Sequence, residues 1–311
     1  MCKLILKRLM LITISIISIS NNAKADEQSD YRQKMLDAYF SVVLIRGYNE
    51  TGGLAYGSGV VLDKNKVITN CHIFRTTKEP WVSRGEDKYE IYTVKADTWR
   101  DLCLVTTAPL PFKPAMIGNS TALARGQEIL AIGHSNGVPA PLTSRGEIKG
   151  LYPQTQGNIS RTNAKFTMGA SGSGLFDNEG KLIGINTFKT AGRNNSAHFA
   201  LPIEWLVDLE KQPETKKFPI VGKALWEEDE EKKPFFMQAA VPETRGDWQK
   251  LRAIAEKWTI QEPSSPEAWY ALGLADEKLL LTQEAKQAYQ ACQKLDAKNP
   301  DVIAKLKMLS E

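Results

Sequence analysis

The sequence has few of the residues that bind metals or build disulfide scaffolds. Its 311 residues include three histidines and four cysteines, and no two cysteines have the spacing of a metal-binding CxxC pair. A zinc-ribbon type of site and a disulfide-rich scaffold are therefore excluded. We expect neither a metal nor a cofactor.

Long apolar runs are also missing. The most apolar segment, residues 9–20, is shorter than the ~20 residues that a bilayer-spanning helix needs. It follows the basic residues Lys3, Lys7 and Arg8 and precedes the small-residue site Ala23-Lys24-Ala25. This order is typical of a cleavable secretory signal peptide; the alternative is a membrane anchor. We interpret residues 1–25 as the signal, which predicts a periplasmic or secreted protein with no stable membrane insertion after cleavage.

The chain beyond that signal lacks a net charge of either sign. Four of its 40 lysines and arginines lie in residues 1–25 and no acidic residue does, which leaves 36 basic and 36 acidic residues. A protein that binds nucleic acid usually carries a basic surface. We therefore expect no nucleic-acid partner.

What the chain does have changes character near residue 211. Residues 38–205 contain many short β-like runs separated by Gly, Asn and Pro, a pattern typical of a β barrel or sandwich. Residues 211–234 are charged and contain several prolines, as a linker does, and residues 235–311 are rich in helix-forming Ala, Leu, Lys and Glu. We expect a β domain over 26–210, a linker over 211–234 and a helical domain over 235–311.

The helical part has an internal repeat with a period of about 34 residues. Trp269, Leu272 and Gly273 match the W-x₂-L-G start of a tetratricopeptide repeat (TPR), and Ala285 and Tyr289 fit its second helix. The alternative is an ordinary helical hairpin with an apolar stripe. A TPR module implies binding of a protein partner or self-association. Fewer than three repeats would be marginal alone and would need support from the β domain, a partner or another copy.

Three residue types suited to nucleophilic catalysis occur in a fixed order. His72 follows a β-like run, Asp101 opens an apolar run, and Ser171 lies in a glycine-rich stretch. A serine hydroxyl needs a neighbouring base, which an imidazole supplies, and a buried carboxylate orients that imidazole. The backbone N–H groups of Gly169 and Ser171 would stabilise the oxyanion. Each feature alone is common in turns and strand ends, and it is their combination that points to a catalytic triad.

Residues 38–210 resemble the trypsin-like protease domain, in particular its HtrA-type bacterial branch. The motifs that carry this resemblance are Gly57-Ser58-Gly59-Val60-Val61, Thr69-Asn70-Cys71-His72, Asp101-Leu102-Cys103-Leu104, residues 169–175, Gly184-Ile185-Asn186-Thr187 and Phe199-Ala200-Leu201-Pro202. The resemblance implies an all-β, chymotrypsin-like double barrel of six strands each. The first barrel would supply His72 and Asp101 and the second Ser171. Ala170 and Ser173 replace the Asn and Gly of the family motif, and no segment resembles a PDZ domain.

The resemblance also implies a function, that of an exported serine endopeptidase. It would cleave protein or peptide substrates through an acyl-enzyme on Ser171, with His72 as general base and acid. The alternative is a catalytically silent or latent protease fold that acts as a scaffold, with the TPR module binding partners.

The resemblance also implies a specificity pocket. In this chain it would be lined by Lys165, Phe166, His198, Phe199 and Ala200. Lys165 takes the place six residues before Ser171 where a trypsin has Asp, so we do not expect cleavage after Arg or Lys. A pocket with Phe166 turned inward would accept small apolar side chains. One with Lys165 or His198 turned inward would accept Glu or Asp. We favour the apolar pocket, and we expect His134, in a loop, to be structural.

Two cysteines flank the catalytic candidates, Cys71 beside His72 and Cys103 two residues after Asp101. If the triad forms, their thiols come close together, and in an exported protein they would form a disulfide. The bond would close a loop of about 30 residues and stabilise the fold by roughly 3 kcal/mol. The alternative is two small buried apolar residues.

Overall fold

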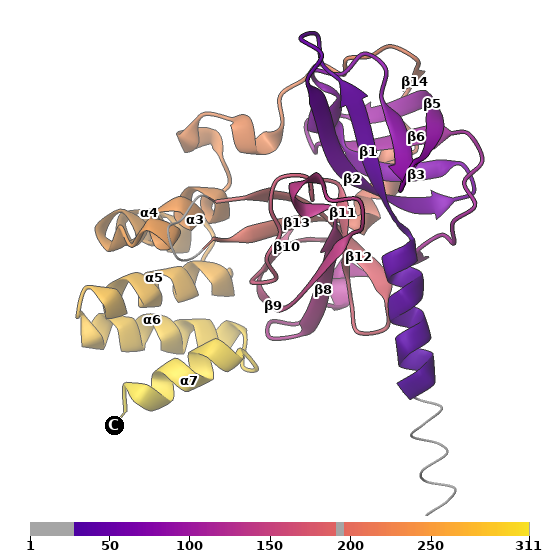
Figure 1. Ribbon diagram of the computed structural model, residues 1–311. Coiled ribbons are helices and arrows are strands. Elements are labelled where there is room, and N and C mark those ends of the chain that lie inside the picture. Colours follow the sequence, from indigo (N-terminus) through magenta and orange to yellow (C-terminus); the bar gives the residue numbers. More distant parts are fainter. Residues whose placement is uncertain (1–27, 191–195, 311) are drawn as a thin grey trace, which may run out of the picture.

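The computed structural model describes residues 28–190 and 196–310, so the expected signal peptide lies outside the described residues. Two β barrels lie side by side, and a set of C-terminal helices packs beside the second of them (Figure 1). Residues 28–40 are helical and lead into the first strand. No helix in the described ranges has the length and apolar character needed to cross a membrane.

The first barrel is a closed antiparallel sheet of six strands in the order β5-β4-β1-β2-β3-β6, closed by the pairing of β5 with β6. Alternate residues point inward, which places valines and isoleucines such as Val43, Ile45 and Val67 in its core. The strands are β1 (Val42–Tyr48), β2 (Leu54–Asp63), β3 (Lys66–Asn70), β4 (Trp81–Arg84), β5 (Asp87–Asp97) and β6 (Leu102–Thr107).

The second barrel repeats this plan in the order β11-β8-β9-β10-β13-β12, closed by β11 and β12. The short β7 (Met116–Ile117) runs parallel to β12 outside the closed ring. The core of the second barrel includes Ile129, Ile148 and Leu175. The strands are β8 (Glu128–Gly133), β9 (Leu142–Pro153), β10 (Asn158–Thr162), β11 (Ser173–Phe176), β12 (Lys181–Lys189) and β13 (His198–Pro202). The expectation of two six-stranded barrels is thus confirmed.

Residues 211–234, which have the composition of a linker, are packed against the barrels. The short strand β14 (Glu214–Thr215) pairs with β5, and the N–H of Ile220 donates to the carbonyl of Phe74 at 3.1 Å. Leu225 opens the 3-10 helix η5 (Leu225–Glu227), and its N–H donates to the carbonyl of Trp99 at 2.9 Å. The composition of the segment did not predict this packing, because its few buried apolar residues, among them Ala224, lie between many charged ones in sequence.

Five helices follow, and side chains cap several of them. The carboxylate of Asp247, the hydroxyl of Ser265 and the amide oxygen of Asn299 each accept a backbone N–H of the first turn. Gly246 ends the first helix in the left-handed region with φ 76°. The helices are α3 (Phe235–Arg245), α4 (Trp248–Gln261), α5 (Pro266–Lys278), α6 (Thr282–Leu295) and α7 (Pro300–Met308).

The helical region is attached to the second barrel by stacking and by ion pairs. The ring of Phe236 in α3 stacks on Tyr152 in β9, with ring centroids 4.1 Å apart. Arg161 in β10 makes two hydrogen bonds of 2.6 Å to the carboxylate of Glu243 in α3. The helices therefore rest on the barrel, as a short helical array requires.

Candidate active site

Strand pairing brings His72 and Asp101 together. Strands β3 and β6 are antiparallel neighbours with Asn70 opposite Leu102, so the short helix that follows β3 begins beside Asp101, the residue that precedes β6. His72 lies in the 3-10 helix η1 (Cys71–Phe74), and Asp101 adopts the left-handed φ of 55°. The N–H of Cys71 and the amide of Asn70 both donate to the Asp101 carbonyl, at 3.2 and 2.9 Å. These bonds hold the unusual turn in place.

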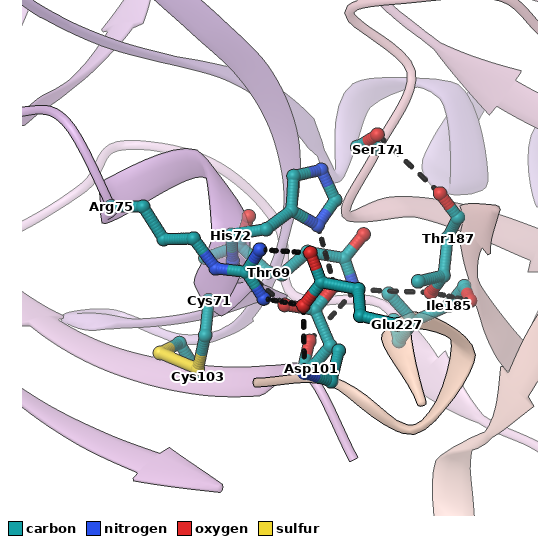
Figure 2. A network of polar contacts seen from close by, with 12 residues as sticks. Thr69, Cys71, His72, Arg75, Asp101, Cys103, Ser171, Ile185, Thr187 and Glu227 are labelled. Atoms are coloured by element: carbon teal, nitrogen blue, oxygen red, sulfur yellow. Dashed lines mark hydrogen bonds and ion pairs between the residues drawn. A yellow bond between two sulfur atoms is a disulfide. The ribbon is translucent and has the colours of Figure 1, made fainter. Parts of the chain in front are cut away.

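The two side chains form a tight hydrogen-bonded pair (Figure 2). His72 Nδ1 lies 2.5 Å from Asp101 Oδ2, and the backbone N–H of His72 donates to Oδ1 at 2.7 Å. Asp101 is fully buried, whereas 30% of the His72 side chain is exposed. Burial raises the pKa of the Asp101 carboxyl, and the bonds from His72 oppose that rise. With Nδ1 donating to the carboxylate, Nε2 is left to act as a base.

Ser171 lies in a loop pinned between the two barrels. Its carbonyl accepts the N–H of Ser58 in the first barrel at 2.8 Å, and the next N–H, of Gly172, donates to Asn186 in the second at 2.9 Å. Gly172 has φ 81°, and a Cβ there would lie 2.2 Å from the Ser58 carbonyl oxygen. Only glycine fits this position without displacing the backbone.

The Ser171 hydroxyl is turned towards the second barrel. Oγ lies 3.5 Å from the carbonyl oxygen of Thr187, and within the described ranges no hydrogen bond joins it to His72 (Figure 2). A contact of 3.5 Å is at the outer limit of a hydrogen bond and holds the hydroxyl weakly. In proteases without substrate, the bond between nucleophile and base is often long and shortens when substrate binds.

The N–H groups of Gly169 and Ser171, the expected oxyanion donors, have no backbone acceptor among the described residues. The carbonyl of Met168 accepts the N–H of Asn136 at 2.5 Å, and in a planar trans peptide the following N–H, of Gly169, points the opposite way. Neither the Gly169 nor the Ser171 N–H donates to another group among the residues that the structure describes. Asn136, which has a left-handed φ of 60°, thus helps to orient the peptide before Gly169, a role that the sequence did not predict.

Asn70 and Thr187 were also missed, and they connect the two halves of the site. The Asn70 amide donates to the Thr187 hydroxyl at 3.0 Å as well as to the Asp101 carbonyl. The Thr187 hydroxyl donates to the Ile185 carbonyl at 2.9 Å. Asn70 belongs to the motif that ends at His72, and Thr187 to the Gly184–Thr187 motif within β12. Their place in those motifs was the available signal.

The expected pocket residues separate into two groups. Lys165 is exposed, whereas Phe166, His198, Phe199 and Ala200 are buried. The rings of Phe166 and His198 meet edge to face with centroids 4.7 Å apart. Burial, and then the nearby Lys189, lower the pKa of His198 to about 4, so its imidazole is neutral at neutral pH.

His134 is buried in the loop before η3 (Ser135–Gly137), where its Nδ1–H donates to the carbonyl of Val138 at 2.8 Å. Its Nε2 is buried without a partner among the described residues. Burial lowers its pKa to about 4.

Cys71 and Cys103 form a disulfide, 32 residues apart in sequence. It ties the helix that carries His72 to the strand that follows Asp101. Cys292 is a buried free thiol in α6. In the described part of the chain, no group of His, Cys, Asp and Glu has the arrangement of a metal site.

Comparison with known proteins adds the family context. Residues 57–185 match the trypsin-like peptidase domain family. The anti-sigma-I factor RsgI9 of Acetivibrio thermocellus is 28% identical over 55% of this chain and 24% of its own length. The probable periplasmic serine endoprotease DegP-like of Buchnera aphidicola is 29% identical over 60% of this chain and 42% of its own. The chain thus spans less than half the length of these relatives.

Among solved structures, the HtrA-type protease AlgW with a tripeptide superposes with a TM-score of 0.52. The match has 23% sequence identity and covers 58% of this chain and 62% of that one, which shows a shared fold. Residues 57–185 are therefore similar to the trypsin-like peptidase domain, and the proteins and solved structures that match the chain include HtrA-type proteases.

Proposed function

We propose that this protein is an exported serine endopeptidase that hydrolyses peptide bonds through an acyl-enzyme on Ser171. The observation that carries the proposal is the pairing of a fully buried Asp101 with a partly exposed His72 at the junction where the Ser171 loop is bonded to both barrels. The HtrA-type relatives support the same reaction class.

The proposed reaction follows from this geometry. Ser171 Oγ attacks the substrate carbonyl while His72 Nε2 takes its proton, and Asp101 stabilises the imidazolium. The oxyanion receives hydrogen bonds from the N–H groups of Gly169 and Ser171, which have no competing acceptor among the described residues. His72 then returns the proton to the leaving amine, and water hydrolyses the acyl-enzyme by the reverse sequence.

We propose a pocket for small apolar side chains next to the scissile bond. Phe166 and His198 fill the buried space, and a neutral His198 has no charge with which to bind Glu or Asp. The exposure of Lys165 supports the same choice, because its ammonium group lies in solvent and not among the buried pocket residues.

The proposed export rests on the signal-like residues 1–25 and is supported by the Cys71–Cys103 bond, since such bonds persist in oxidising compartments. We further propose the division into a protease domain over 26–210, a connecting segment over 211–234 and a TPR-like domain over 235–311. The TPR assignment is supported by Gly273, where a Cβ would lie 2.7 Å from the Tyr289 ring, so the two helices approach closely there. Such a module would bind a protein partner or another copy of this chain.

Cleavage of a peptide library by the mature protein, with Ser171→Ala as control, tests the proposal. We expect cleavage after small apolar residues by the wild type alone. Equal cleavage by the two proteins would refute a role for Ser171, and cleavage after Glu or Asp would refute the apolar pocket.

A latent protease is the second candidate, because the Ser171 hydroxyl contacts Thr187 and not His72. It predicts no cleavage by the free protein and cleavage after a protein partner binds. A scaffold without catalysis predicts no cleavage in either condition.

A further inference from the structure

The segment between the barrels and the helices passes directly beside His72. The Trp226 ring meets the His72 ring edge to face, with centroids 6.1 Å apart. It also stacks on Phe188, at 5.1 Å and 25°. Phe188 follows Thr187, whose carbonyl oxygen contacts the Ser171 hydroxyl. The Phe188 ring also stacks on the core residue Phe199, with centroids 4.7 Å apart. Phe188 therefore packs against both a core ring and Trp226.

The next residue, Glu227, attaches this segment to the end of η1, the short helix that contains His72. Its two carboxylate oxygens each accept a hydrogen bond of 2.6 Å from Arg75, three residues after His72 (Figure 2). One of them also accepts the N–H of Ala224 at 2.8 Å. The bond from Arg75 lowers the pKa of Glu227, so the pair stays ionised and each charge neutralises the other.

Buried residues also attach the same segment to the barrels. Ala224 and Leu225 are buried, and the Leu225 N–H is bonded to Trp99. Lifting the segment from the barrels would expose the buried Leu225 side chain to water, which is unfavourable. It would also break the bidentate pair of Arg75 and Glu227. These anchors indicate a fixed part of the active-site surface and not a removable cover.

We propose that Trp226 is a specificity-determining residue, which forms with Phe188 and the edge of His72 an aromatic wall for a substrate side chain adjacent to the scissile bond. Aromatic rings contribute large apolar contact area at low entropic cost. Glu227, the next residue along the chain, is paired with Arg75, so these two charges neutralise each other. The wall therefore selects an apolar side chain at this substrate position. The proposal rests on the proposed endopeptidase function and deepens it.

A position-scanning peptide library tests the wall with wild type, Trp226→Ala and the matched control Tyr92→Ala, which removes an exposed aromatic ring from β5. We expect Trp226→Ala to lose the apolar preference at one position next to the scissile bond, with kcat/KM for those peptides lower by roughly tenfold. The rate at which a small fluorophosphonate labels Ser171 is measured in the same proteins, because that probe reports the reactivity of Ser171 without a substrate side chain next to the wall. Tyr92→Ala should behave as wild type in both assays.

The outcomes separate the two proposals. An unchanged cleavage profile in Trp226→Ala, with wild-type labelling, overturns the wall alone and leaves the endopeptidase intact. Faster labelling and a uniform rise in kcat/KM also overturn it, because they would show that Trp226 covers the site. A folded wild type that never labels overturns the proposed function and the wall with it. If Trp226→Ala fails to fold, Trp226→Leu and Trp226→Phe decide, with the profile altered in the first and retained in the second.

Discussion

At the scale of single residues, the site depends on side chains that are buried in a defined protonation state. Asp101 is enclosed completely and accepts two hydrogen bonds from His72, one from the ring and one from the backbone. The carboxylate therefore fixes which ring nitrogen carries the proton. An amide in its place keeps the shape of the side chain and loses that control.

The Asp101→Asn variant tests this role. We expect kcat to fall by about 10,000-fold at neutral pH, because the imidazole is held in the wrong tautomer. Asp87→Asn, at the exposed first residue of β5, is the control and should retain wild-type activity. Steady-state kinetics on a cleaved library peptide provide the measurement, and a loss below tenfold for Asp101→Asn would contradict the triad.

His134 and His198 make stability depend on pH. Both have folded-state pKa values of about 4, below the ordinary 6.5 of histidine, because both are buried. The unfolded chain therefore binds more protons between these values, so stability is full above pH 6.5 and falls as the pH drops towards 4. The loss is on the order of 3 kcal/mol for each residue.

Urea unfolding from pH 7.5 to 4.5 measures this loss. The midpoint should fall with pH in the wild type and fall less in His134→Asn and in His198→Asn. A wild-type midpoint that stays constant down to pH 4.5 would show that neither histidine is held neutral.

At the scale of elements, the disulfide joins the two pieces of chain that carry His72 and Asp101. Cys71 and Cys103 close a loop of 32 residues, and in the chain-entropy model such a cross-link stabilises the fold by about 3 to 4 kcal/mol. The double variant Cys71→Ala/Cys103→Ala should therefore unfold at lower urea concentration. Cys292→Ala removes a thiol outside the bond and is the control. Equal midpoints for the double variant and wild type would show that the cross-link does not stabilise the protein.

Much at this scale was readable from the sequence. Short apolar runs such as 41–46 and 128–133 correspond to β1 and β8, and their barrel arrangement followed from the family motifs. Contacts between distant segments were not readable. Trp226 and Glu227 lie in a charged segment with no periodicity, and only the folded chain places them against Phe188 and Arg75. The hydroxyl direction of Ser171 is likewise a property of the assembled loop.

At the scale of the whole molecule, the helical region is tied to the second barrel by charges that are largely removed from water. Arg161 and Glu243 each have a side-chain exposure of 18%, and the carboxylate holds the guanidinium through two hydrogen bonds. Losing one partner leaves a poorly solvated charge at the junction, which is costly.

Glu243→Ala should destabilise this junction by about 3 kcal/mol. The double variant Arg161→Met/Glu243→Leu removes both charges and should regain most of that loss, because apolar residues of similar size replace the pair. Thermal unfolding followed by circular dichroism compares the three proteins. Equal losses in the single and double variants would contradict an ion pair that matters because it is buried.

The central claim is that Ser171 is a nucleophile activated by His72 and Asp101. Intact-protein mass spectrometry after treatment with a fluorophosphonate measures it most directly, with Ser171→Ala and His72→Ala as controls. The account predicts one adduct, mapped to Ser171 in the wild type, absent from Ser171→Ala and strongly reduced in His72→Ala. A folded wild-type protein that acquires no adduct, or acquires it equally in all three proteins, would contradict the account.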